Sequence, residues 1–296
     1  MPKTQREYKD RLFNFIFGRK GNEAWTLSLY NAVNGTHYTD PREIEITTIR
    51  EILYLGMRND LAFVIIHMLN LYEQQSSYNP NMPVRLLIYV GHLLEKYMTE
   101  RRLNRYGSTQ LELPVPKLVV FYNGKREQPE EKILRLSDAF PAGSESDIEV
   151  RVRMLNVNYG HNQALMAACR PLSEYAWLVN EVRRQSEAEG YERAINAAID
   201  SMPDTFEIKP LLEAHRAEVK GMMIEEYKEA DAMELFREEG RAEGRAEGRK
   251  EGRKEGMEAG MEVGRKEGRE KQAQAVYERL RALNMPEAQA RAVAFG

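Results

Sequence analysis

The chain has 296 residues and a formal net charge of −3, from 43 Lys and Arg against 46 Asp and Glu. This length allows one sizeable core and an appendage. The single cysteine, Cys169, excludes a disulfide framework and a cysteine-based zinc site. No run of about 18 apolar residues is present, which excludes a transmembrane helix. The first residues also lack the apolar region of a signal peptide, so we expect a cytoplasmic protein with no membrane partner.

Charge is distributed unevenly along the chain. Residues 1–136 hold 19 Lys and Arg against 15 Asp and Glu, which is +4, whereas the remaining 160 residues hold 24 against 31, which is −7. A mildly basic N-terminal half suits a partner with a phosphate backbone. An excess of four charges is small, however, and any domain can show it by chance, so charge alone does not assign DNA as the partner.

The N-terminal half combines helical and strand patterns. Apolar residues at helical spacing predict helices, and short runs rich in β-branched and aromatic residues predict strands. The expected elements are, in chain order, helices over 5–17 and 22–34, a strand within 43–54, a hairpin over 60–75, a helix over 84–105 and a buried strand over 115–122. This order of helix, three strands, helix and strand predicts an α/β fold.

The predicted hairpin places acidic side chains on its strands. If His67 and Met68 form the loop, the numbers of directly opposed residues sum to 135, and Asp60 faces Gln75. Opposed side chains share a sheet face, as do residues two apart on one strand. Asp60, Glu73 and Gln75 would therefore converge on one side of the sheet. A register shift of one residue would turn Asp60 to the other side.

Two carboxylates on one face suit Mg²⁺ or Mn²⁺, because both ions prefer oxygen ligands. Such an ion polarises a phosphoryl oxygen and lowers the pKa of its bound water. Gln75 can orient a water molecule but carries no charge. The alternative interpretation is that Asp60 and Glu73 are solvated residues at strand ends, as acidic residues at such positions commonly are.

Several segments, taken in order, resemble the PD-(D/E)XK nuclease family of transposase-like, recombination-promoting nucleases. The main segments are Asn59–Phe63, Leu69–Ser76 and Asn79–Arg85. Supporting segments are Lys9-Asp10 with Phe13 and Phe17, then Phe121–Gly124, Cys169–Ala176 and His215–Val219. The resemblance runs from about residue 5 to about residue 240, and its specificity lies in the order of the segments and not in any single one.

The resemblance implies a restriction-endonuclease-like core (α-β-β-β-α-β) with an all-helical C-terminal extension. It also implies metal-dependent DNA cleavage linked to recombination or mobile elements. Asp60 and Glu73 would be the metal-binding and catalytic carboxylates. Gln75 stands where the wider superfamily has its catalytic lysine, and Lys117 or Lys125, near the next strand, could supply a displaced cation. The alternative is a catalytically inactive nuclease fold that binds DNA or a protein partner.

Arg85 and Tyr89 are neighbours at i and i+4 near the start of the helix predicted over 84–105. Because this helix follows Gln75 closely, both side chains would reach a substrate phosphate. The alternative is that Tyr89 packs in the core and Arg85 pairs with a surface acid.

Helical patterns dominate the rest of the chain, over Asn162–Gln185, Tyr191–Ser201 and Lys209–Glu239. We therefore predict four parts. They are a nuclease-like core over 1–160, a helical extension over 161–236, a Glu-Gly-Arg repeat over 237–270 and a short helical segment over 271–296.

The repeat places a glycine at every fourth position from Gly240 to Gly268. Its ten Lys and Arg balance its ten Glu, so it is not a cationic DNA-binding tail. Eight glycines cost a helix about 8 kcal/mol relative to alanine, and like charges four residues apart destabilise it further. The sequence therefore leaves two alternatives, a helix that orders by self-association into a homo-oligomer or a flexible linker.

Overall fold

The structure is a computed structural model that describes residues 11–46, 61–65 and 67–296. Residues of the chain fall into two compact units, divided after Met233. The first unit contains a mixed sheet with helices, which confirms an α/β fold. The second unit is helical.

The elements up to the last strand are α1 (Leu12–Phe17), α2 (Glu23–Asn34), η1 (Pro41–Glu43), β1 (Ile44–Ile46), β2 (Leu61–Ile65), β3 (Met68–Gln75), α3 (Met82–Glu100), β4 (Val115–Tyr122), β5 (Glu131–Arg135), η2 (Leu136–Ala139) and β6 (Arg151–Asn156). The helices that follow are α4 (Gln163–Ala168), α5 (Arg170–Glu189), α6 (Tyr191–Ser201), α7 (Lys209–Ala214), α8 (Arg216–Ala282) and α9 (Glu287–Phe295).

The described residues form a six-stranded sheet in the order β1-β2-β3-β4-β6-β5. Strands β3, β4 and β6 run parallel, and the other neighbours are antiparallel. Helix α3 makes the crossover that joins the parallel strands β3 and β4. Strand β4 has the predicted bounds, but β5 and β6 were not predicted. Strand β5 is an edge strand with a single buried residue, Leu134, so it lacks the alternating apolar pattern that predicts a strand.

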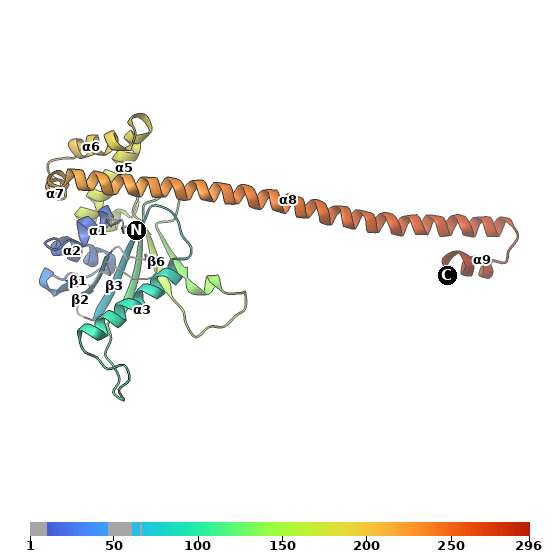
Figure 1. Cartoon of the computed structure of the whole chain (residues 1–296), viewed down its shortest axis with the longest axis horizontal. Helices are drawn as coiled ribbons and strands as arrows, with labels where there is room; N and C mark the ends of the chain where they lie inside the picture. Colours follow the sequence, from blue (N-terminus) through green and yellow to red (C-terminus); the bar gives the residue numbers. More distant parts are fainter. Residues whose placement is uncertain (1–10, 47–60, 66) are drawn as a thin grey trace, which may run out of the picture. The chain divides into compact units, whose positions relative to one another are not determined.

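Alternate side chains of the sheet enter two hydrophobic clusters, one on each face. Helix α3 covers one face, and α1, α2 and α5 cover the other (Figure 1). On β3, Leu69 and Leu71 face α3, whereas Tyr72 faces the opposite layer. This alternation puts Glu73 on the α3 face together with Leu71.

The predicted hairpin register was wrong by two. Strand β2 pairs with β3 from Leu61 opposite Tyr72 to Ile65 opposite Met68, so paired numbers sum to 133. Met68 belongs to β3 and not to the loop. The connection lacks a strongly preferred hairpin turn such as Asn-Gly, so it does not fix the register, and apolar side chains pair instead. A shift of two keeps each residue on its face. The predicted pairing of Asp60 lies outside the described residues.

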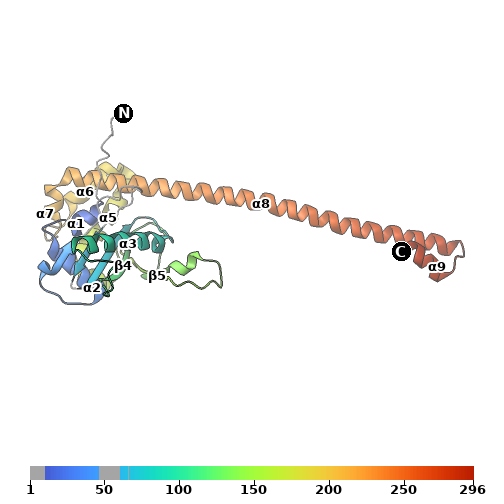
Figure 2. The same cartoon turned by 60° about the horizontal axis from the view of Figure 1, so that its bottom comes forward.

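The segment after β5, drawn in light green in Figure 2, extends away from the sheet. Helix α8 begins in the first unit, where Val219, Met222 and Met223 are buried in the same cluster as α5 and α6.

Two of the helices predicted after β6 are each divided into two helices in the structure. The predicted helix over 162–185 is two helices that meet at Cys169, because Pro171 begins a new helix after an extended residue. The predicted helix over 209–239 likewise divides at His215. Cys169 is fully buried, and burial raises the pKa of its thiol to about 11. Its role is packing between α2 and α5.

In the second unit, α8 continues to Ala282 and the four-residue repeat is helical throughout. A Cβ atom added at any repeat glycine from Gly240 to Gly268 would meet no other atom within 4 Å. Helix α9 contacts the end of α8 through Ala290, which is fully buried, and through the rings of Tyr277 and Phe295, 6.1 Å apart. Among the described residues, no helix is both long and apolar enough to span a bilayer.

Candidate active site

Glu73 is an acidic side chain buried inside the sheet. It lies three residues before Ser76, near the end of β3, and its exposed fraction is 2%. Gln75, the next residue on the same face, is 7% exposed. Burial of a charged carboxylate costs several kcal/mol unless other groups compensate it. The partners of Glu73 therefore define this site.

Arg85 on α3 is the cation beside Glu73. Its Nη2 atom lies 3.8 Å from Glu73 Oε2, which is longer than a direct charge-assisted hydrogen bond. The same Nη2 donates a hydrogen bond of 3.2 Å to the Tyr89 hydroxyl, and the guanidinium lies 5.9 Å from the centre of the Tyr89 ring. Tyr89 is 1% exposed, so both alternatives for this pair hold in part: Tyr89 packs in the core, and Arg85 pairs with an acid, which is buried Glu73.

The charge of Arg85 is maintained despite its partial burial. Burial alone would lower the pKa of Arg85, but the hydrogen bond to Tyr89 and the charge of Glu73 raise it, and the net shift is upward. Arg11, at the start of α1, acts in the opposite direction on the same guanidinium through its own charge. Two arginines thus lie near the carboxyl end of β3.

Gln75 is oriented by Met82, the first residue of α3. Its Nε2 atom lies 2.6 Å from the Met82 sulfur, which also lies 3.7 Å from Arg85 Nη1. Within the part of the chain that the structure describes, no donor bonds the Oε1 atom of Gln75. The amide oxygen is therefore available to a ligand on the Glu73 face.

A second polar group lies on the opposite face of the same strand end. Gln74 donates from Nε2 to Asn123 Oδ1 at 2.7 Å, and Asn123 Nδ2 donates to the Tyr175 hydroxyl at 2.9 Å. Arg11 donates to the Gln74 carbonyl at 2.8 Å. Gln74 and Tyr72 are both fully buried.

The turn after β4 approaches the end of β3 closely. A Cβ atom at Gly124 would lie 2.5 Å from the Ser76 carbonyl oxygen and 2.5 Å from the Tyr122 hydroxyl, so only glycine fits there without rearrangement. The Gly124 carbonyl accepts a hydrogen bond from Asn158 Nδ2 at 3.1 Å. Segments that carry the family resemblance, at residues 74–76, 123–124 and 175, therefore meet at one edge of the sheet.

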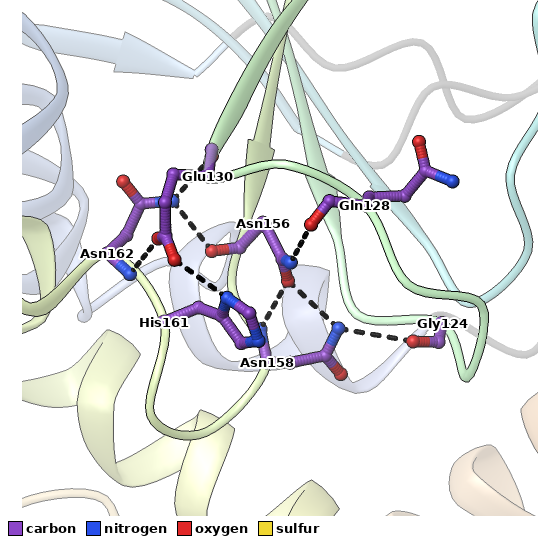
Figure 3. A network of polar contacts seen from close by, with 7 residues as sticks. All are labelled: Gly124, Gln128, Glu130, Asn156, Asn158, His161 and Asn162. Atoms are coloured by element: carbon purple, nitrogen blue, oxygen red, sulfur yellow. Dashed lines mark hydrogen bonds and ion pairs between the residues drawn. The ribbon is translucent and has the colours of Figure 1, made fainter.

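Figure 3 shows how this turn is fixed to the loop after β6. Asn156 donates to the Gln128 carbonyl at 2.9 Å and accepts from Asn158. Glu130 accepts hydrogen bonds from the Asn162 backbone and, at 2.8 Å, from His161 Nδ1. These bonds, the Asn162 backbone bond first, lower the pKa of Glu130. This network of hydrogen bonds joins the segment after β4 to the loop after β6, and no sequence motif predicted it.

The two lysines considered as displaced cations lie elsewhere. Lys117 on β4 pairs with Asn70 on β3. Asn70 shares its sheet face with Tyr72, which enters the cluster opposite α3. Lys117 therefore lies on the opposite sheet face from Glu73. Lys125 forms an ion pair with Asp231 at 3.5 Å. Asp60, the second predicted carboxylate, lies outside the described residues.

The described part of the chain contains no group of three or more His, Cys, Asp or Glu side chains that could hold a metal ion. Its contribution to a metal site would be the Glu73 carboxylate and the Gln75 amide oxygen, which share a face. Both are hard oxygen donors of the kind that Mg²⁺ and Mn²⁺ prefer, so their chemistry fits either ion.

A cavity among the described residues lies away from Glu73. It has a volume of about 550 Å³ and lies between α2 and the segment 35–41, with Asn31, His37 and Tyr38 in its lining. It contains none of the predicted site residues.

Comparison of the chain with protein-family models, with curated proteins and with solved structures found no match.

Removal of the Arg85 charge should destabilise the first unit. We expect Arg85→Met to lower the free energy of unfolding by about 2 kcal/mol, because it removes the guanidinium that lies 3.8 Å from the buried Glu73 carboxylate. The measurement is urea unfolding followed by tryptophan fluorescence, since Trp25 and Trp177 both lie in the first unit.

The control is Arg101→Met, which breaks an exposed pair with Glu45 at 2.7 Å. An exposed pair contributes at most about 1 kcal/mol. Equal effects of the two substitutions would contradict a compensating role for Arg85.

Proposed function

We propose that this protein is a metal-dependent DNA endonuclease of the restriction-endonuclease-like type, linked to recombination or mobile elements. The observation that supports the proposal most is the burial of Glu73 at the carboxyl end of β3, beside Arg85 and on the face of Gln75. The element order up to β4 is the one that the family resemblance implies. DNA is the proposed partner.

In this proposal Asp60 and Glu73 bind Mg²⁺ or Mn²⁺, and the Gln75 amide oxygen braces the ion or its water. The bound ion would polarise the scissile phosphate and lower the pKa of a bound water molecule. The protein residues position the strand: Tyr89 orients Arg85 through its hydroxyl, and Arg85 binds a phosphate oxygen.

Arg85 is also a candidate for the positive charge that the catalytic lysine supplies in the wider superfamily. It lies within 4 Å of the Glu73 carboxylate, whereas Lys117 and Lys125 lie elsewhere. We propose that the Arg85 guanidinium supplies the positive charge that Gln75 cannot. A guanidinium can donate two parallel hydrogen bonds to a phosphate, so it can stabilise the charge that develops during hydrolysis.

A plasmid-nicking assay with Mg²⁺ or Mn²⁺ tests this function. We expect Asp60→Asn and Glu73→Gln each to reduce the nicking rate at least about 100-fold, since each removes a charged ligand. Arg85→Met should also reduce the rate strongly, and Arg85→Lys should retain part of it because the charge remains.

Glu112→Gln, which changes an exposed carboxylate outside the site, is the control and should cleave as the unchanged protein does. Cleavage that survives both Asp60→Asn and Glu73→Gln would reject the assignment of the site.

A second candidate function is a catalytically inactive nuclease fold that binds DNA or protein and self-associates. The contacts of Gln75 and Arg85 with the Met82 sulfur favour it, because such contacts are also what packing without catalysis would produce. Salt-dependent DNA binding by the unchanged protein, without nicking under either metal, would support this candidate instead.

The helical repeat supports a homo-oligomer as a further partner in either function. In the second unit no ion pair within 4.0 Å joins the described side chains of residues 238–270, so their charges are available to another copy. Successive repeats rotate by about 40° around the helix, so stripes of Glu and Arg wind slowly along it. The Arg stripe of one copy can face the Glu stripe of another, and the glycine stripe allows the close approach of two backbones.

Light scattering of the full chain and of residues 1–236 tests self-association. We expect a larger subunit number for the full chain, because only it retains the repeat. A full-length variant with Arg241, Arg245 and Arg249 changed to Glu keeps the length and should lower the subunit number. Equal subunit numbers for the full chain and the truncation would reject the idea.

A further inference from the structure

A pair of cations surrounds one tyrosine at the carboxyl edge of the sheet. Lys132 Nζ lies 4.9 Å from the centre of the Tyr78 ring and 3.0 Å from the Tyr78 hydroxyl oxygen. The Arg126 guanidinium carbon lies 5.4 Å from the same ring centre. Both distances suit cation–π contacts. We call Tyr78, Arg126 and Lys132 the tyrosine platform.

Neighbouring structure fixes the platform. Tyr78 lies in the loop between β3 and α3, where it packs against the cluster that also contains Met82 and Leu86. The Tyr122 hydroxyl donates to the Arg126 carbonyl at 2.6 Å, which holds the turn that carries Arg126. Lys132 is on β5, whose position is set by pairing with β6.

The two carboxylates that precede Lys132 in sequence are engaged elsewhere. Glu131 forms an ion pair with Arg153 at 2.8 Å, and Glu130 points to His161 and Asn162 (Figure 3). Across the described ranges, neither Arg126 nor Lys132 has a carboxylate within 4.0 Å. Both side chains are exposed, so their charges face solvent.

The platform lies on the same sheet face as the candidate site. Glu73 pairs with Val120, Val120 with Met154, and Met154 with Lys132, so one row across four strands leads from Glu73 to Lys132. Three strand spacings separate its ends by about 14 Å. The backbone of one DNA strand winds around the helix axis, so its successive phosphates lie about twice the axial rise of about 3.4 Å apart, and this separation corresponds to about two nucleotides.

We propose that the tyrosine platform binds the phosphate backbone of DNA about two nucleotides from the bond at Glu73. Arg126 and Lys132 supply the two cations that bind phosphate oxygens, and the Tyr78 ring and hydroxyl hold them side by side. The proposal rests on the proposed function for the identity of the strand at Glu73. Its contacts reach only the backbone, so it contributes affinity and position without sequence preference.

The test is fluorescence anisotropy of a labelled 20-nucleotide duplex with the full chain in Ca²⁺, at several salt concentrations. We expect the double variant Arg126→Gln and Lys132→Gln to bind at least about tenfold more weakly at low salt. The slope of log K against log salt should fall in magnitude by about two, because two phosphate contacts are lost.

The matched control changes Arg135 and Arg151 to Gln. These cross-strand neighbours at the other end of β5 are exposed, carry the same two charges and lie on the opposite sheet face from Lys132. This control should bind within about twofold of the unchanged protein and keep its slope. If both double variants lose affinity and slope equally, the effect is one of net charge and the proposal is overturned.

Glu73→Gln separates the two proposals, because it should abolish nicking but preserve binding. If the unchanged protein binds DNA through the platform without cleaving it, the proposed function fails and the platform stands. If the unchanged protein cleaves DNA, and the double variant of Arg126 and Lys132 binds DNA with unchanged affinity and salt dependence, only the platform proposal is rejected. Absence of any DNA binding by the unchanged protein overturns both.

Discussion

The burial of one carboxylate, Glu73, constrains the whole candidate site. An acidic side chain at 2% exposure inside a sheet requires compensation, and α3 provides it with Arg85, which Tyr89 in turn orients. This contact requires α3 to cross the sheet directly after β3. The crossover makes β3 and β4 parallel neighbours and so brings the turn at Gly124 against the end of β3.

The two faces of β3 perform different tasks at this edge. On the α3 face, Glu73 and Gln75 present oxygen atoms next to a guanidinium. On the other face, Gln74 joins Asn123 and Tyr175 in a hydrogen-bonded network that ties the sheet to α5. Some of the segments that resemble the nuclease family therefore have a structural role. Residues 123–124 and 175 support the sheet edge at which Glu73 lies.

Sequence patterns predicted the central elements well. The apolar run of β4 and the apolar face of α3 are strong signals, and alternation along β3 predicted the shared face of Glu73 and Gln75. Strand β5 was missed because an edge strand with one buried residue shows little periodicity. The predicted hairpin register was wrong because no turn residues fix it.

The partner of Arg85 could not be predicted, since a contact between a helix and a strand depends on packing that neither segment encodes alone. The repeat was predicted to be helical or flexible, and its helix extends without interruption from the first unit into the second.

Metal binding is the most direct test of the account, because it precedes any question of substrate. Titration of the full chain with Mn²⁺ by calorimetry should show one site whose affinity falls at least about tenfold in Glu73→Gln. Glu112→Gln should bind as the unchanged protein does. Equal Mn²⁺ affinity of the unchanged protein and Glu73→Gln would contradict the central claim that the buried carboxylate of β3 holds the ion.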